Sequence, residues 1–403
     1  MTSWLSTAVL LPPALWTALP AVADAWTALA GGRGTPLPPV RKDGGRPRLI
    51  FLVPAHDEEL LIERCVKSLV TQDYPADRYT VAVIADNCSD QTAARAREFG
   101  ATVLERHDTS ARGKHHAIAW ALTQVPINDY AAFIIIDADA VVNREFAESV
   151  GAWPDLPNRV MHTYDGLTNE FENWLTRLAG LLTRNRYDIG LPLKARAGLS
   201  VPFTGDGMVI GTQVLAREGW KVETITEGWE LYARYTLNGL QVNYEPRAVF
   251  YDQEAKSVTQ GEAQRQRWAS GRFHVLKLYL GRILSAPGTR LLQRVDLLAE
   301  LSSFGPVMRG MVAMAGVALA LLLKPALWLL LTLLFASGVL QPAFYSLISL
   351  ARHPEPGATL VAFAKLPSYA LWRLWVGVRG LLPSPRGAEW VRTARHKESG
   401  GSH

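Results

Sequence analysis

Three apolar stretches constrain the fold of this 403-residue chain most strongly. Residues Trp4 to Ala23 contain no charged side chain, and Pro306 to Leu323 and Ala326 to Leu350 are separated only by Lys324-Pro325. About 20 apolar residues in a helix are enough to cross a bilayer, where each backbone polar group must be bonded within the segment. The sequence therefore predicts one N-terminal transmembrane helix and a C-terminal transmembrane hairpin. No Lys or Arg precedes the first stretch, which favours an uncleaved anchor over a signal peptide.

The distribution of basic residues predicts the orientation in the membrane. The net charge is +5, and basic residues gather near Arg41-Lys42-Arg46-Arg48 and from Arg373 to Lys397, beside the apolar stretches. This layout fits loops that face an anionic leaflet better than a nucleic-acid surface. By the positive-inside rule, we expect an integral protein of the bacterial inner-membrane type, with its large middle region in the cytoplasm and no nucleic-acid partner.

Two further segments, 273–284 and 366–382, mix Trp, Tyr and Leu with Lys or Arg at helical intervals. They fit helices that lie in the headgroup region, although amphipathic helices of a soluble domain have the same pattern. The expected division is an anchor at 1–32, a soluble domain at 33–272, interfacial helices at 273–305, a transmembrane hairpin at 306–350, and a basic interfacial segment at 351–403.

The soluble region alternates between strand and helix patterns. An apolar run at 49–53 is typical of a strand buried on both faces of a sheet, and 79–85, 101–105 and 131–136 are predicted as further strands. Helical patterns separate them at 57–70, 91–99 and 115–122. This alternation predicts an α/β fold with a doubly wound, mostly parallel sheet. Ligands of such sheets bind beyond the carboxyl ends of the strands. Polar clusters occur at these places: His56-Asp57-Glu58-Glu59, Asp86-Asn87-Cys88-Ser89-Asp90, Arg112-Gly113-Lys114 and Asp137-Ala138-Asp139.

These clusters suit a divalent cation and a diphosphate. Asp137 and Asp139 can both approach one hard cation, Asp86 can accept hydrogen bonds from a nucleobase or ribose, and Lys114 can offset phosphate charge. Gln264-Arg265-Gln266-Arg267-Trp268, just ahead of the apolar C-terminal third, predicts a polyanion site beside a membrane. Its alternative interpretation is an amphipathic helix in which Trp268 packs and the arginines are solvated.

The segments PAHDEE, ADNCSDQT, RGKHHAIAWAL, DADAVV, TGDGM and QRQRW, in this order over residues 49–275, resemble the membrane-bound family 2 glycosyltransferases. Weaker similarity continues in WRLW and EWVRTAR. The chain is similar to ceramide glucosyltransferases and hopanoid-type lipid glycosyltransferases, and more distantly to cellulose, chitin and hyaluronan synthases. The resemblance implies a GT-A fold that binds a nucleotide diphosphate sugar, usually a UDP-sugar, with Mg²⁺ or Mn²⁺, and transfers the sugar with inversion.

Carried over by motif, the resemblance assigns roles to individual residues. It implies that Lys114 lies near the nucleotide or its phosphates, that Asp137 contacts nucleotide or metal, and that Asp139 binds the metal. Residues implied for the uridine are Ala55, Asp57, Glu58 and Asp86. The segment that begins at Gln264 would close over the donor. Within it, Arg265 and Arg267 would offset diphosphate charge, and Trp268 would lie near the sugar or acceptor.

The chain departs from the family at the general base. Members usually carry Thr-Glu-Asp, the Asp being the base, whereas this chain has Thr226-Glu227-Gly228-Trp229-Glu230. Inverting transfer needs a carboxylate within reach of the acceptor hydroxyl. Glu227 is the first substitute, Asp206 the second and Glu230 the third. The alternative is that Glu227 only positions a neighbour.

The leading hypothesis is a membrane-bound transferase that adds one sugar to a lipid at the cytoplasmic face. A processive polysaccharide synthase is the alternative within enzymes, although three spans are few for a polymer pore. A third hypothesis is a nucleotide-sugar-binding protein that lost its base at residue 228, in which case Gly228→Asp would restore activity. The region 162–202 has few signals and does not identify the acceptor.

Overall fold

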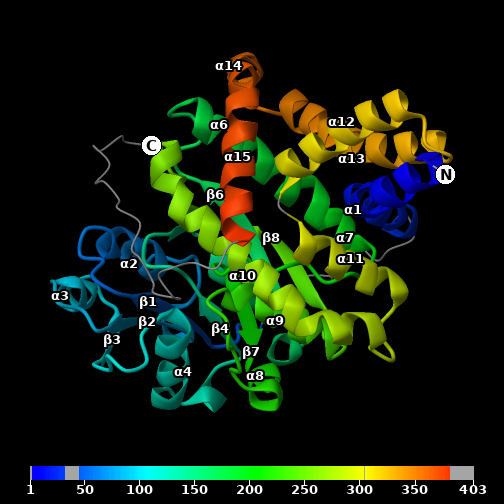
Figure 1. Ribbon diagram of the computed structural model, residues 1–403. Helices are drawn as coiled ribbons and strands as arrows, with labels where there is room; N and C mark the ends of the chain where they lie inside the picture. Colours follow the sequence, from blue (N-terminus) through cyan, green and yellow to red (C-terminus); the bar gives the residue numbers. More distant parts are fainter. Residues whose placement is uncertain (1, 32–44, 304, 382–403) are drawn as a thin grey trace.

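The computed structural model describes residues 2–31, 45–303 and 305–381 (Figure 1). Two segments used above, Arg41-Lys42 and EWVRTAR, lie outside the described residues. The soluble part is built around one eight-stranded sheet with the order β3-β2-β1-β4-β7-β6-β8-β5. The strands are β1 (Leu49–Ala55), β2 (Tyr79–Asp86), β3 (Thr102–Arg106), β4 (Ala132–Ile135), β5 (Val141–Val142), β6 (Val160–Leu167), β7 (Met208–Gly211) and β8 (Val242–Asp252).

The half of the sheet formed by β1 to β4 is the part predicted from the sequence. These strands pair in parallel, as expected for strands connected by helices. Beyond β4 the sheet is mixed, because β7 is antiparallel to β4 and β6, and β5 is antiparallel to β8. The two antiparallel strands have four and two residues, too short for a periodic signal.

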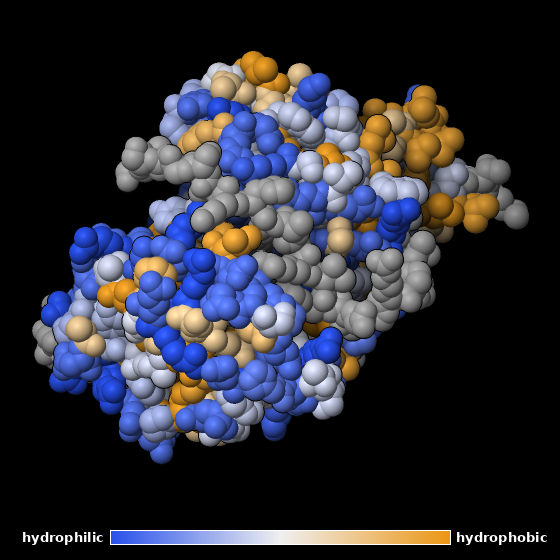
Figure 2. Space-filling model, turned by 90° about the vertical axis from the view of Figure 1, so that its left-hand side faces the viewer, coloured by the Kyte–Doolittle hydropathy of each residue, from blue (hydrophilic) through white to orange (hydrophobic). Residues whose placement is uncertain are grey.

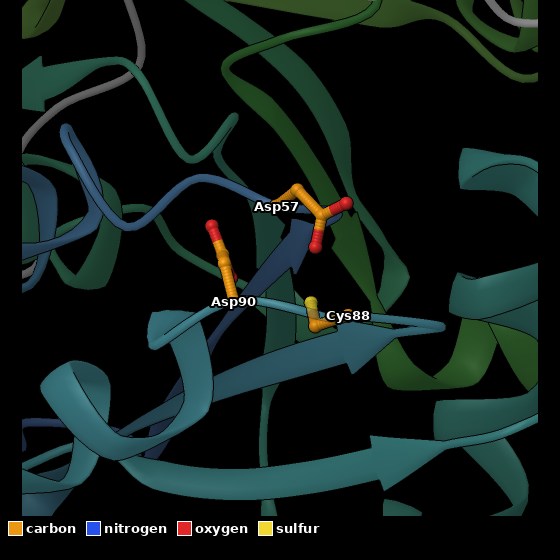
Figure 3. A group of neighbouring side chains, drawn as sticks. All are labelled: Asp57, Cys88 and Asp90. Atoms are coloured by element: carbon orange, nitrogen blue, oxygen red, sulfur yellow. The ribbon is translucent and has the colours of Figure 1, made fainter.

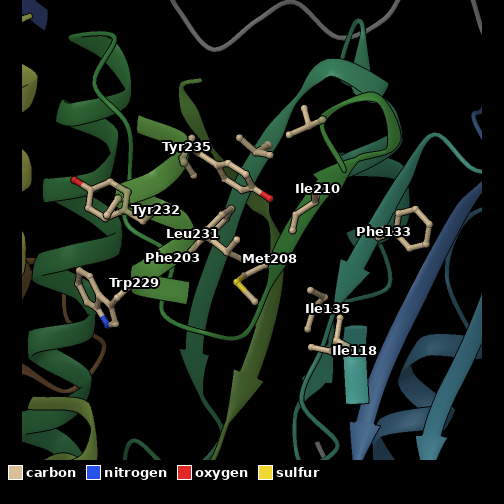
Figure 4. Packing of buried hydrophobic residues seen from close by; sticks show 14 of the residues in the cluster. Ile118, Phe133, Ile135, Phe203, Met208, Ile210, Trp229, Leu231, Tyr232 and Tyr235 are labelled. Atoms are coloured by element: carbon tan, nitrogen blue, oxygen red, sulfur yellow. The ribbon is translucent and has the colours of Figure 1, made fainter. Parts of the chain in front are cut away.

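Alternate residues of each strand pack into two cores on opposite faces of the sheet. From β1, Ile50 and Leu52 join one core, whereas Leu49, Phe51 and Val53 join the other. The first core also contains Phe203, Met208 and the apolar face of helix α9 (Glu227–Leu237) (Figure 4).

The helices of the soluble part are α2 (Ile62–Val70), α3 (Thr92–Glu98), α4 (Lys114–Gln124), α5 (Phe146–Gly151), α6 (Trp174–Arg184), α7 (Leu191–Arg196), α8 (Thr212–Glu218) and α9 (Glu227–Leu237). Short helical turns are η1 (Ala76–Arg78), η2 (Ile127–Asp129), η3 (Leu156–Asn158), η4 (Asn185–Gly190) and η5 (Phe363–Lys365).

The three predicted spans are helices: α1 (Thr2–Gly31), α12 (Pro306–Leu323) and α13 (Trp328–Ala351). Each is long and apolar enough to cross a membrane, and the three pack together at one end of the molecule (Figure 1). Large apolar side chains point outward from all three, including Leu5, Leu322 and Leu340. Figure 2 shows apolar side chains gathered at its upper right, whereas most of the remaining visible surface is hydrophilic.

Four helices, α10 (Val258–Ser285), α11 (Leu291–Ser302), α14 (Pro356–Ala362) and α15 (Leu366–Leu381), link this end to the sheet. Helix α10 runs without a break through residue 272, so the expected domain boundary lies inside a helix. It packs against α15, where Glu262 pairs with Arg379 at 3.1 Å. Of the two segments expected to be interfacial, 273–284 is therefore the C-terminal part of α10, and the other corresponds to α15.

Candidate active site

A single cavity of about 880 Å³ connects the edge of the sheet to the three apolar helices. At one end it is lined by Ala55 and Asp86, the last residues of β1 and β2, and by Asp139, which follows β4. At the other end it reaches Pro20 of α1, Pro306 of α12 and Pro342 of α13. The polar clusters expected at the strand ends therefore share one space with the membrane-facing helices.

Three carboxylates gather where β4 ends. Asp206 Oδ1 accepts hydrogen bonds from the backbone nitrogens of Asp137, at 3.0 Å, and Gly207, at 2.6 Å. Burial raises the pKa of Asp206 well above its usual value, and the charges of Asp137 and Asp139 raise it further against the opposing charge of Lys114. Crowded carboxylates of this kind fit a hard divalent cation, which prefers oxygen ligands and would relieve their repulsion.

Lys114, the first residue of α4, connects this group to α9. Its Nζ lies 2.5 Å from Asp137 Oδ1 and 3.1 Å from Glu227 Oε1, and donates to the carbonyl oxygen of Gly205 at 2.5 Å. Burial acts to lower the pKa of Lys114, but the charges of Asp137 and Glu227 outweigh it and raise the pKa above its usual value. The side chain predicted to offset phosphate charge therefore lies among the predicted carboxylates.

The candidate general bases differ in whether they line the cavity. Glu227 is 7% exposed and lines the cavity at the start of α9. Glu230, one turn later, instead accepts hydrogen bonds from the backbone nitrogens of Glu223, at 2.9 Å, and Thr224, at 2.8 Å. It does not line the cavity and holds the loop before α9. The geometry favours Glu227 and Asp206 over Glu230.

The residues predicted for the nucleotide fall into two groups. Ala55, Glu58 and Asp86 line the cavity, and the Asp86 carboxylate is held by Arg106 Nη1 at 2.6 Å. Asp57 lies outside the lining residues. Its carboxylate accepts a hydrogen bond from the backbone nitrogen of Ser89 at 2.7 Å, which ties two loops together.

Asp57, Cys88 and Asp90 lie close enough to suggest a metal site (Figure 3). Their polar atoms already have partners in the loops. Asp90 accepts from the backbone nitrogens of Thr92, at 2.9 Å, and Glu59, at 3.1 Å, and Cys88 Sγ donates to the carbonyl oxygen of Ala55. This cluster therefore connects the loops after β1 and β2 through hydrogen bonds. The carboxylates after β4 remain the better candidates for cation ligands.

The four residues of α10 predicted for the donor, Gln264, Arg265, Arg267 and Trp268, all line the cavity. Their side chains differ in what they contact. Arg265 Nη2 pairs with Glu254 Oε1 at 2.6 Å, and its guanidinium lies 5.4 Å from the ring centre of Trp372. Arg267 has no ion-pair partner among the residues that the structure describes, and burial lowers its pKa against the charges of Glu227 and Asp137. Arg267 is therefore better placed than Arg265 to receive an anion.

Several lining residues have no counterpart in the sequence analysis. Asp165, at the end of β6, has its pKa raised to about 8 by burial and by the charge of Asp206. Arg186 comes from η4, in the region without recognisable signals. Arg272 follows Trp268 by one turn of α10 and also lines the cavity. In the sequence, its only indication is this helical spacing, which places it on the same face of the helix as Trp268.

Comparisons with known proteins agree with this geometry. The family described as "Glycosyltransferase like family 2" matches residues 47–271. The chain is 24% identical over 262 residues to "Probable glycosyltransferase YdaM" of Bacillus subtilis, covering 61% of this chain and 60% of that protein. It is 29% identical over 268 residues to "Beta-monoglucosyldiacylglycerol synthase" of Trichormus variabilis, covering 61% of this chain and 54% of that protein. The matched region thus spans between half and two thirds of these relatives.

Among solved structures, the fold is similar to that of a mannosyltransferase, PcManGT from Pyrobaculum calidifontis, in complex with GDP-Man and Mn²⁺. The TM-score is 0.56 at 17% sequence identity, over 92% of this chain and 97% of that one. At this identity the likeness concerns the fold, and it extends beyond the sheet to most of the helices.

Proposed function

The chain belongs to glycosyltransferase family 2, and from this premise we propose that it transfers one sugar from a UDP-sugar to a membrane lipid at the cytoplasmic face, with inversion. The observation that carries the proposal is the single cavity. It contains the strand-end carboxylates expected for a nucleotide sugar and also reaches three helices long enough to cross a membrane. A donor from the cytoplasm and an acceptor from the bilayer can therefore meet within it.

The donor end has the charges that a nucleotide diphosphate needs. Asp137 and Asp139, with Asp206 beside them, would hold Mg²⁺ or Mn²⁺, which neutralises charge on the leaving diphosphate when bound. Arg267 faces the same space and would offset the remaining charge as the bond to the sugar breaks. Ala55, Glu58 and Asp86 would contact the nucleoside.

Glu227 is the proposed general base. Its carboxylate lines the cavity, and Lys114 at 3.1 Å stabilises its negative charge. In this proposal Glu227 takes the proton of the acceptor hydroxyl while the hydroxyl oxygen bonds to the anomeric carbon and the nucleoside diphosphate leaves. Asp206 also lines the cavity, but it ranks behind Glu227 because its Oδ1 already accepts two backbone hydrogen bonds.

A lipid acceptor is supported by the relatives and by the helices. The name of the Trichormus relative specifies a diacylglycerol lipid. The apolar surfaces of α1, α12 and α13 would hold the cavity mouth at the membrane. Arg46 and Arg48, beyond the end of α1, and Arg352, after α13, fall on one side of the predicted membrane, which supports a cytoplasmic catalytic domain.

The assignment of a UDP-sugar as the donor is tested with the full chain purified in detergent. Binding of UDP and GDP is measured by titration calorimetry with Mn²⁺ or with EDTA, followed by hydrolysis of a panel of nucleotide sugars. The proposal predicts tighter binding of UDP than of GDP, with loss of affinity in EDTA. Equal binding of both nucleotides would contradict the UDP-sugar assignment, and unchanged binding in EDTA would contradict the metal.

A further inference from the structure

Three arginines of the cavity wall lack the full set of partners that buried cations need. Arg272 of α10 and Arg373 of α15 form neither an ion pair nor a hydrogen bond within the described part of the chain. Arg186 of η4 lies 3.5 Å from Glu300, but its Nε and Nη2 are buried without a hydrogen-bond partner among the described residues. Glu300 is itself shared with Lys194 at 2.5 Å, and Lys194 also pairs with Asp296 at 2.6 Å. Neither carboxylate forms an ion pair with Arg272 or Arg373 within the described residues, so these two guanidinium groups can receive an anion.

Two of these guanidinium groups lie against one indole. Arg272 lies 4.8 Å and Arg186 lies 5.8 Å from the ring centre of Trp229. Burial lowers the pKa of Arg272 to about 10, with Glu300 opposing the shift and Arg186 and Arg373 adding to it. All three stay charged at neutral pH. Contact with an aromatic ring offsets part of the cost of burying like charges, and an anion would offset the rest.

The arginines share the cavity with the proposed base. Trp229 and Glu227 both belong to the first turn of α9 and both line this space. From there the cavity continues to Pro306 and Arg309 at the start of α12 and to Tyr345 of α13. A lipid headgroup that enters from the membrane would pass the arginines on its way to Glu227.

We propose that Arg186, Arg272 and Arg373 form an anion subsite that binds a phosphate group in the headgroup of the acceptor lipid. The inference rests on the proposed lipid glycosyltransferase function and specifies its acceptor class. Planar guanidinium groups donate paired hydrogen bonds to phosphate oxygens, and three of them surround an anion more completely than an ammonium group does. A neutral diacylglycerol would leave their charges unmatched.

The test measures lipid binding by the full chain in neutral detergent. The probes are dihexanoyl phosphatidic acid, dihexanoylglycerol and inorganic phosphate, titrated with UDP and Mn²⁺ present. The phosphatidic acid is expected to bind most tightly. Arg272→Gln should weaken its binding by about 10-fold, as expected for the loss of one charged hydrogen-bonding group. Arg272→Lys should weaken it less, which distinguishes lost charge from lost folding.

Arg282→Gln is the matched control, because Arg282 is an exposed arginine of the same helix outside the cavity. It should leave all affinities unchanged. Equal binding of dihexanoylglycerol and the phosphatidic acid would overturn the inference, and so would inorganic phosphate binding as tightly as the lipid. If Arg272→Gln weakened UDP binding as much as lipid binding, the arginine would belong to the donor diphosphate, and the inference would also fail. Absence of sugar transfer with intact, arginine-dependent lipid binding would instead contradict the proposed function and leave the subsite standing.

Discussion

The backbone nitrogen of Gly205 lies 2.6 Å from the position that a Cβ atom at Gly228 would occupy. Helix α9 therefore packs directly on the loop that carries Asp206, and the contact requires glycine at 228. This is the position at which the resemblance to family 2 implies the Asp of the general base. The missing Asp is thus accompanied by a close backbone approach that leaves no room for one, so Gly228→Asp is a poor test of restored activity.

Gly228→Ala should destabilise the protein and lower activity. A methyl group there meets backbone atoms of residues 203 and 205, which have little freedom to move, and overpacking of this kind costs about 1–3 kcal/mol. The melting temperature in detergent measures the effect. Gly281→Ala, in open space on α10, is the control and should be neutral or slightly stabilising. An active and equally stable Gly228→Ala variant would show that the loop does not pack as described.

Glu227→Gln should reduce the rate of sugar transfer by about 10²–10⁴-fold, the usual contribution of a general base. UDP affinity should change little, since the substitution keeps the side-chain shape. Single-turnover transfer and UDP titration measure the two effects separately. If the rate persisted in Glu227→Gln and fell only in Asp206→Asn, the base assignment would move to Asp206.

Glu230→Gln should show the opposite pattern. Glu230 is 2% exposed and holds two backbone nitrogens of the loop before α9, so weakening this carboxylate should reduce stability more than the chemical step. Thermal unfolding and the transfer rate at a temperature well below unfolding distinguish these effects. A large loss of rate in a fully stable Glu230→Gln protein would return this residue to the list of candidate bases.

His162 should make the protein acid-sensitive. It is fully buried, its Nε2 lies 3.1 Å from Tyr187 Oη and 3.2 Å from Thr204 Oγ1, and burial with the charge of Arg186 lowers its pKa to about 3. Because the folded-state pKa lies below the ordinary value near 6.5, the stabilisation is complete above about pH 6.5 and is lost progressively toward pH 3. Between pH 7 and pH 5 the loss is about 2 kcal/mol.

The measurement for His162 is the dependence of the melting temperature on pH. His162→Gln should flatten the dependence relative to the unchanged protein, even though other groups also titrate. His107→Gln is the control, since the His107 side chain is 70% exposed. Identical pH dependence in the unchanged protein and His162→Gln would exclude this buried imidazole as the acid-sensitive group.

The parallel half of the sheet and the three spans could be predicted because their signals are local. Four apolar runs with polar ends define β1 to β4, and the length of an apolar helix defines a span. The short antiparallel strand β7 could not be predicted, because its four residues form a strand only by pairing with β4 and β6. Arg186 and Asp165 were missed for a related reason: their roles arise from partners distant in the sequence. Asp57 was assigned by motif to the nucleotide, yet its carboxylate bonds to the neighbouring loop.

The most direct test of the central claim is the mass of the lipid product. Purified protein in vesicles made from a total membrane lipid extract is incubated with a panel of UDP-sugars and Mn²⁺, with a matched reaction in EDTA, and the lipids are analysed by mass spectrometry. The proposed function predicts one lipid species heavier by a single sugar unit, present with Mn²⁺ and absent in EDTA. A ladder of repeated units would contradict single addition, and unchanged lipids with every donor, despite intact UDP binding, would contradict transfer to a lipid.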